Sequence, residues 1–524
     1  MKKQAVLAGG VCIALICGCS SGADSPNSPS VDPVEARLGA NGAHAGERHF
    51  DEPPGNSNGR ACGTCHVIGE HRAMSAANVE ARLASNPTDP LFKAIDADDP
   101  HASPLTFNNL RHGLVRITLR LPDNVDLIQV PPAWTAVAPN GAVQDWWATT
   151  VVPGSRLGDS LAAGKLPEIV TPADRMIEVW RSVPSVDNTA YSGRFLVDGR
   201  EGTLQAQALG AFQLHSEVDH SIGNGVLKLI ADFERTQFSS SRAANVFGAL
   251  TAEANLQGVS IFNADGSTNL AVVDNVPKPE DTDPAFAAGR DVYARFCTAC
   301  HGKATDDRVE NESVRAGLFV DVDHDGNVKF QTVPGLDIKV PVNVPRPGNE
   351  SLNIGTSIIT YFAQLAKDQG MVPPLPSFNQ GADFPRYRLR FYTDATRTVQ
   401  VTDLPPLVLH DPNSPFLPLV NPDGSATVGQ NFAPQGWTSD PGRALITGDH
   451  ADFEGMNIPQ LRGIANTAPY FHDNSMPTLA AIVDTYSLFI LPFIPPLNPL
   501  GAPPGQHAMT APERAALLEF LSQF

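Results

Sequence analysis

Alternating hydrophobic and polar positions predict short strands in two distant parts of the chain. From Leu114 to Leu121, aliphatic residues alternate with Arg and Thr, which is typical of a half-buried strand. Tyr387 to Thr393 and Thr398 to Thr402 have the composition of two strands joined in a hairpin. We expect both regions to belong to β-containing insertions, the first over about 75–180 and the second over about 303–440.

Helical periodicity and capping residues mark the remaining regular elements. Asp283 and Pro284 fit the N-cap and first positions of a helix. Thr510 and Glu513 form a capping box ahead of an amphipathic run. The patterns together predict helices over 283–296, 351–367, 479–488 and 510–524.

Composition agrees with a soluble globular protein. The chain has 524 residues, which is enough for two or three domains, and is 42% hydrophobic and 18% charged. Its 46 prolines and 43 glycines indicate many loops. The net charge of −19 argues against nucleic acids and anionic membrane surfaces as partners and would suit a basic protein.

The first residues resemble an export signal. Lys2 and Lys3 precede an apolar run from Ala5 to Ile16 that is too short to form a stable membrane span. The end of this run is similar to a bacterial lipoprotein cleavage site, which predicts a signal peptide over 1–18 and a lipid on Cys19. Ser20 then favours the outer membrane, and 19–45 would be a flexible tether in the periplasm or on the cell surface. An ordinary soluble secreted protein is the alternative.

Four of the seven cysteines form two copies of one pattern. Cys12, Cys17 and Cys19 lie in the leader, and the others stand in Cys62–His66 and Cys297–His301, each with the spacing CxxCH. In c-type haem attachment, each thiol adds to a vinyl group and the next histidine binds the iron. The sequence therefore predicts two covalent haems, attached through Cys62, Cys65, Cys297 and Cys300. A four-thiolate zinc site is the alternative.

Several patches share a family resemblance. The segments are Pro184–Asn188, Asp198–Arg200 with Gln207 and Glu217, and Thr467–Asp473, which reads TAPYFHD. They resemble the bacterial di-haem cytochrome c peroxidases, whose superfamily includes the MauG-type enzymes. The resemblance implies a mainly α fold with two cytochrome c-like haem domains, over 46–275 and 276–524.

The resemblance also implies roles for individual residues. Gln207 and Glu217 would line the peroxide pocket of the N-terminal haem, with Glu217 transferring the proton. His66 and His301 would each bind an iron. Tyr486 stands where the peroxidases have a methionine, and it would be the second haem's other ligand, as in the MauG type.

Three further expectations follow from the resemblance. His472 and Arg462 would tune the surroundings of the second haem. Calcium would bind near backbone oxygens of Thr467 and Pro469, although Ser182 stands where the family has an asparagine. The electron donor would be a small redox protein, such as a monohaem cytochrome c or a cupredoxin.

The sequence thus favours a di-haem peroxidase or oxidase that reduces hydrogen peroxide. Two alternatives remain open. One is a tethered electron-transfer cytochrome without catalysis. The other is oxidation of an organic or protein substrate, as in the MauG type or the di-haem oxygenases. The oligomeric state is left open as well.

Overall fold

The structure is a computed structural model of the chain. It describes residues 40–129, 168–192, 194–256, 258–260, 262, 287–301, 330–332, 339–341, 351–353, 385, 387–404, 410–411, 414–418, 438–459, 461–493, 497–502 and 506–523. The expected signal peptide, Cys19 and most of the tether lie outside these residues. Among the helices that are described, none has both the length and the apolar character needed to cross a bilayer.

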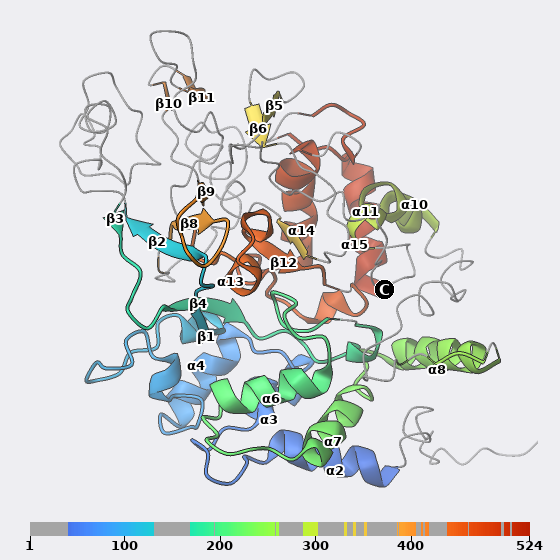
Figure 1. Cartoon of the computed structure of the whole chain (residues 1–524). Helices are drawn as coiled ribbons and strands as arrows, with labels where there is room; N and C mark the ends of the chain where they lie inside the picture. The colour runs from blue at the N-terminus through green and yellow to red at the C-terminus, as the bar shows by residue number, and fades with distance from the viewer. Residues whose placement is uncertain are drawn as a thin grey trace, which may run out of the picture.

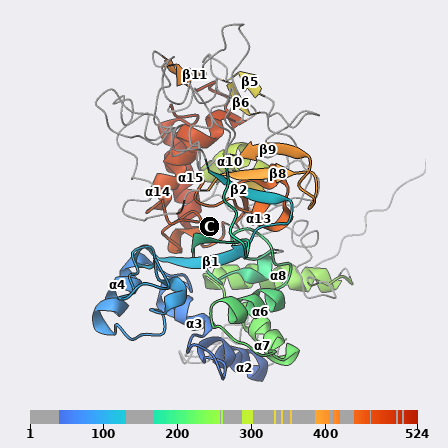
Figure 2. The same cartoon turned by 60° about the vertical axis from the view of Figure 1, so that its left-hand side comes forward.

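The helices gather in two groups at opposite ends of the molecule. Figure 1 shows the helices of the first half, in blue and green, at one end and those of the C-terminal part, in red, at the other; Figure 2 shows the same separation after rotation. The helices are α2 (Ala40–Asp51), α3 (Cys62–Cys65), α4 (Ala76–Ser85), α6 (Leu204–Leu214), α7 (Asn224–Glu234), α8 (Ser241–Leu256), α10 (Ala287–Phe296), α11 (Thr298–His301), α13 (Ala444–Thr447), α14 (Leu479–Thr485) and α15 (Ala511–Gln523).

The strands are short and pair antiparallel. Strand β1 pairs with β4, and a four-stranded sheet has the order β3-β2-β8-β9. Two-stranded ladders join β5 to β6, β7 to β12 and β10 to β11. The strands are β1 (Leu114–Arg120), β2 (Val125–Gln129), β3 (Glu168–Ile169), β4 (Met176–Ser182), β5 (Phe330–Thr332), β6 (Lys339–Pro341), β7 (Ser351–Asn353), β8 (Leu389–Tyr392), β9 (Gln400–Leu404), β10 (His410–Asp411), β11 (Ser414–Pro418) and β12 (Gly455–Asn457).

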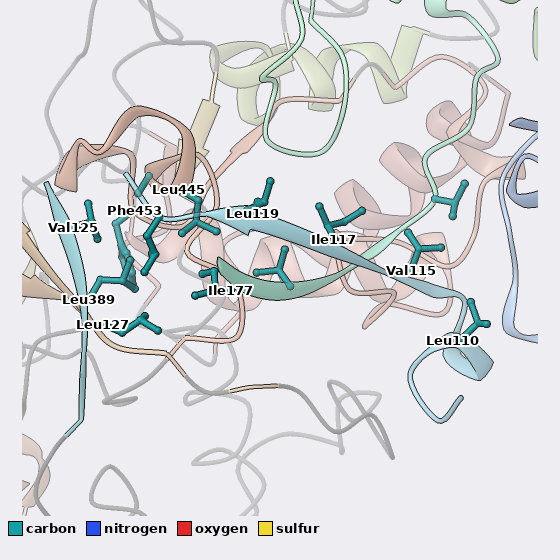
Figure 3. Packing of buried hydrophobic residues seen from close by; sticks show 14 of the residues in the cluster. Leu110, Val115, Ile117, Leu119, Val125, Leu127, Ile177, Leu389, Leu445 and Phe453 are labelled. Carbon is teal, nitrogen blue, oxygen red and sulfur yellow. The ribbon is translucent and has the colours of Figure 1, made fainter. Parts of the chain in front are cut away.

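The two expected insertions are joined in one sheet. Strand β2 comes from the first and β8 from the second, and they pair with Val125 opposite Phe391 and Leu127 opposite Leu389. The same buried cluster holds aliphatic residues of β1, β4 and β8 together with Leu445 and Phe453, as Figure 3 shows. The two regions are therefore not separate insertions as expected, because side chains from both are needed to complete one core.

A buried group of charges also joins the two halves. The guanidinium of Arg181 donates to both carboxylate oxygens of Asp440, at 2.7 and 2.9 Å, and to Asp198 at 2.5 Å. Arg200 donates to the same oxygen of Asp198 at 2.7 Å. Arg181, Asp198 and Asp440 are almost fully buried. Since Asp440 lies far along the chain from the others, this network fixes the C-terminal part against the strand β4.

Several element predictions are confirmed. Strand β1 and the hairpin of β8 and β9 form where expected. Helix α15 opens on the predicted capping box, with the Thr510 N–H donating to Glu513 at 2.7 Å. Helix α10 ends at Phe296 and buries Gly289, Val292 and Tyr293 against α15, while the expected capping residues Asp283 and Pro284 lie outside the described residues.

Three expectations need correction. Residues 351–353 form strand β7 against β12, because the apolar Leu352 pairs with Met456 in an antiparallel ladder; 354–367 lie outside the described residues. Helix α14 ends at Thr485, and a π-helical turn follows over Tyr486–Ile490. Helix α2 begins at Ala40, within the stretch expected to be a tether.

Candidate functional site

Each CxxCH motif contains a helical turn that closes on its histidine. The His66 N–H donates to the Cys62 carbonyl at 3.0 Å, and the His301 N–H donates to the Cys297 carbonyl at 2.8 Å. In the first motif this turn is α3, which places its two cysteines three positions apart on one side of the helix. The same main-chain hydrogen bond, from the histidine N–H to the carbonyl of the first cysteine, thus forms within each motif.

Backbone carbonyls orient both histidine rings. Nδ1 of His66 lies 2.8 Å from the Arg72 carbonyl oxygen, and Nδ1 of His301 lies 3.1 Å from that of Pro459. Because a carbonyl only accepts, each Nδ1 carries the proton and each Nε2 keeps its lone pair. Burial lowers the pKa of both rings to about 4, so both are neutral near pH 7. Neutral imidazole is the form that binds iron.

Both motifs open onto one cavity of about 490 Å³. Cys65 and His66 line one part of it, and Cys297 and His301 line another. A volume of this size lies within the range of small-molecule and cofactor sites, about 300–1,000 Å³. The side chains in the wall are mainly apolar, which would keep water away from a bound group.

One face of helix α6 forms part of the wall. Gln207, Gly210, Ala211, Leu214 and His215 all line the cavity, and their spacing places them on a single helical face. A Cβ on Gly210 would meet nothing closer than Glu201 Oε1 at 3.9 Å. Gln207 therefore lines the cavity from the same helical face as Gly210, beside open space.

The second predicted residue of the peroxide pocket lies elsewhere. Glu217 is exposed, and its Oε2 accepts a hydrogen bond from Asn58 Nδ2 at 2.7 Å. It is not among the described residues that line the cavity. Helix α6 ends at Leu214, and Glu217 has a left-handed backbone with φ +51°. This turn directs the carboxylate towards Asn58 rather than into the cavity.

Helix α14 and the π-helical turn form the wall near the second motif. Ile482, Val483, Tyr486 and Ile490 line the cavity. Tyr486 is the first residue of the π-helical turn, a feature that often occurs at functional sites. Tyr486 and His301 therefore face the same cavity, as ligation of a common iron would require.

The other residues expected near the second haem also line this cavity. Arg462 and His472 are both buried, and the guanidinium of Arg462 lies 5.6 Å from the ring centre of Tyr191. Nδ1 of His472 is buried, and no hydrogen-bond partner for it occurs in the described part of the chain. A bound group carrying polar substituents would give this nitrogen a partner.

The calcium expectation stays a prediction. Thr467 and Pro469 line the cavity. Ser182 uses its hydroxyl and its N–H on two neighbouring carbonyls, donating to Phe471 at 3.1 Å and His472 at 2.6 Å. Among the described side chains, no group of three or more His, Cys, Asp or Glu could hold a metal ion.

Two cavity residues have no counterpart in the sequence predictions. Glu234 is buried, and burial raises the pKa of its carboxyl to about 8, so the acid stays protonated at neutral pH. His215 follows Gln207 by two helical turns, and burial lowers the pKa of its imidazole. Helical spacing from Gln207 could have indicated His215, whereas nothing local in the sequence marks Glu234.

The donors present suit covalently attached haem. Cys62 and Cys65 are free thiols, and burial raises the pKa of both, that of Cys65 to about 11. Each motif adds an oriented neutral imidazole, the wall is apolar, and Gly210 leaves room beside it. These are the features needed to attach a porphyrin by its edge and to bind its iron.

No family model and no curated protein matches the chain. Among solved structures, the chain is similar to a MauG-like protein associated with microbial copper homeostasis, with 15% sequence identity and a TM-score of 0.33. The match covers 95% of this chain and 91% of that one. A likeness at this level does not assign the chain to a family.

Proposed function

We propose that the protein is a di-haem c-type peroxidase or oxidase that reduces hydrogen peroxide with electrons from a small redox protein. One observation carries the proposal. His66 and His301, each directly behind a CxxC pair, line the same cavity, and each donates from Nδ1 to a main-chain carbonyl. A backbone acceptor fixes the tautomer and orients the ring with the lone pair on Nε2, as is usual for histidines that bind a metal.

Haem attached at Cys62, Cys65, Cys297 and Cys300 would supply the redox-active iron. The chain's own residues form its surroundings. His66 and His301 offer neutral nitrogens, and Tyr486 offers a phenolic oxygen on the side of the second motif. Gln207 can donate a hydrogen bond from its amide and orient peroxide in the cavity. The apolar wall excludes water, so a hydrogen bond inside it is stronger than one in solvent.

The reduction consumes two electrons and two protons for each peroxide and yields two molecules of water. The acidic chain, with a net charge of −19, would attract a basic electron donor. The assignment of Glu217 as the proton carrier rests on the resemblance alone, since its carboxylate is held outside the cavity by Asn58. Gln207 is the part of the predicted peroxide pocket that the geometry supports.

The test begins with haem content and continues with turnover. The exported protein should carry two covalent haems per chain in the pyridine haemochrome assay, and the double variant Cys62→Ser/Cys65→Ser should carry one. Peroxide should oxidise a reduced monohaem cytochrome c or cupredoxin in the presence of the protein. That variant, which keeps the second motif, should lose this turnover. A chain without covalent haem would refute the proposal.

Two other functions would give different results. An electron-transfer cytochrome would show two haems and no reaction with peroxide. Oxidation of an organic or protein substrate is favoured by one specific observation, the position of Tyr486 in the wall shared with His301, because an anionic tyrosinate stabilises oxidised iron. That function would give a peroxide-oxidised protein that persists without a donor, and Tyr486→Phe should shorten its lifetime.

A further inference from the structure

Tyr486 begins a π-helical turn whose hydrogen bonding is not completed within the helix. In this turn the Leu491 N–H donates to the Tyr486 carbonyl, five residues back, whereas in an α-helix it would donate to that of Ser487. The π-helical pattern cannot satisfy the Ser487 carbonyl either, because the residue five positions further on is Pro492, which has no N–H. The turn therefore leaves a main-chain carbonyl of a fully buried residue in need of a donor from elsewhere.

The segment just before helix α15 supplies that donor. The Ala508 N–H donates to the Ser487 carbonyl at 2.8 Å. The next N–H along the chain, that of Met509, donates to the Ser487 hydroxyl oxygen at 3.0 Å. Ser487 thus accepts two consecutive main-chain N–H groups, one on its carbonyl and one on its side chain. The π-helical turn depends on this segment for its hydrogen bonding.

Arg514 fixes the same segment against α14. Its Nη1 donates to the Met509 carbonyl at 2.9 Å, and its Nε lies 3.0 Å from Asp484 Oδ1. Asp484 stands on α14 two residues before Tyr486, and Ser487 directly follows Tyr486. The start of α15 is therefore bonded to residues on both sides of Tyr486.

Helix α15 also packs on α10, the helix that leads into the second motif. The two helices approach closely, since a Cβ on Gly289 would overlap the Cβ of Phe520. Nη1 of Arg295, near the end of α10, lies 2.7 Å from Glu513 Oε1. Helix α15 therefore fixes the turn that carries Tyr486 relative to the helix that leads into the second motif.

We propose that Ser487 is a positioning residue for the second haem: by accepting the N–H groups of Ala508 and Met509, it holds the phenolic oxygen of Tyr486 where it can share an iron with His301. The inference rests on the proposed function, because it requires haem at the second motif. Metal ligands keep their geometry only when their supporting residues are fixed, and loss of a support weakens metal binding. Without these bonds the Leu491 N–H could return to the Ser487 carbonyl, and the wall beside Tyr486 would repack.

Resonance Raman spectroscopy of the ferric holoprotein tests the proposal, because phenolate bound to ferric iron gives enhanced ring vibrations. The wild type should show these bands, and Tyr486→Phe should lose them. In Ser487→Ala the Met509 N–H loses its acceptor, so Tyr486 should bind the iron less firmly. Loss of one buried hydrogen bond shifts an equilibrium about fivefold, so the cyanide concentration that removes half of the bands should fall about fivefold.

Thr485→Val is the matched control. It removes a buried hydroxyl on the other side of Tyr486, one that donates to Met476 Sδ at 3.3 Å and not to the segment before α15. It should leave the cyanide concentration unchanged, even if it lowers the melting temperature. Arg514→Met alters a partly exposed residue, and it should shift cyanide binding in the same direction as Ser487→Ala. It keeps the proposal testable if Ser487→Ala does not fold.

Three results would decide against the inference or its premise. Phenolate bands and cyanide binding that stay unchanged in Ser487→Ala, or that change equally in Thr485→Val, would overturn it, because Ser487 would then support only the fold. A wild-type protein with two covalent haems and no phenolate bands would also overturn it, while peroxide reduction would still stand. Absence of covalent haem would instead refute the proposed function, which haemochrome analysis reports separately.

Discussion

The substitution Asp440→Asn tests the buried charge network between the two halves. The carboxylate of Asp440 accepts two hydrogen bonds from Arg181 and a third from the Gly442 N–H at 2.8 Å. Asparagine keeps the shape and one acceptor, but it removes the negative charge. Two guanidinium groups, those of Arg181 and Arg200, would then share the single carboxylate of Asp198 in a buried site. The change therefore leaves one uncompensated positive charge.

Breaking a buried pair by removing one partner costs about 3–5 kcal/mol. For a large domain each kcal/mol lowers the melting temperature by about 2–4 °C, so the shift should be on the order of 10 °C. Differential scanning calorimetry at pH 7 measures it, read at the first transition because a chain of this size need not unfold in one step. Asp123→Asn is the matched control, since its pair with Arg120 is exposed, and it should move the transition by less than about 2 °C.

Two further measurements can refute this reasoning. If Asp440→Asn behaves like Asp123→Asn, the network does not stabilise the junction. The double variant Arg181→Met/Asp440→Leu should recover much of the loss, because an apolar pair needs no charge compensation. The fall in stability at acid pH gives an independent check. Burial opposes the ionisation of Asp198, but Arg181 and Arg200 hold its pKa below the ordinary value. The stabilisation that ionised Asp198 gives the folded protein is thus complete above about pH 4 and is lost as the pH falls further.

Two other predictions concern Glu234 and the close helix packing. Because the folded pKa of Glu234 is raised to about 8, its contribution is complete below the unfolded value and is lost as pH rises towards 8. Gln at position 234 stays neutral at every pH, so the melting temperature of Glu234→Gln should fall less on going to pH 9 than that of the wild type. Equal pH profiles of the two proteins would contradict the assignment. Gly289→Ala should destabilise by about 1–3 kcal/mol, since its Cβ would overlap Phe520 and the Ala516 carbonyl. Gly225→Ala, in helix α7 with open space around it, should be neutral or stabilising by up to about 1 kcal/mol, and urea unfolding compares the two.

Local patterns predicted local structure well. The capping box at Thr510, the strand from Leu114 and the hairpin of β8 and β9 each depend on interactions within a few residues. The helix predicted from Ser351 was wrong at its first three residues, because these form β7, whose ladder depends on β12 about a hundred residues away. A periodic sequence does not show which distant strand will pair with it.

The sequence located some residues of the candidate site and missed others. Covalent motifs are contiguous, so the two CxxCH sequences located the histidines that share the cavity. Gln207 also lines it, and its role towards peroxide stays a prediction. The sequence could not show that α6 ends at Leu214 or that Glu217 takes a left-handed backbone. One such turn decides which of two neighbouring side chains, Glu217 or His215, faces inward.

The pairing of β2 with β8 has a consequence for how the chain can be divided. The expected boundary at 275 and 276 falls in the connection between these two strands, so cutting there separates them. A fragment ending at 275 would expose one edge of β2 and the aliphatic side chains that Leu389 and Phe391 cover. Open strand edges beside uncovered apolar surface promote aggregation. During synthesis this core likewise cannot close until residues 389–404 have been made, so its apolar surface stays uncovered and open to aggregation for that time.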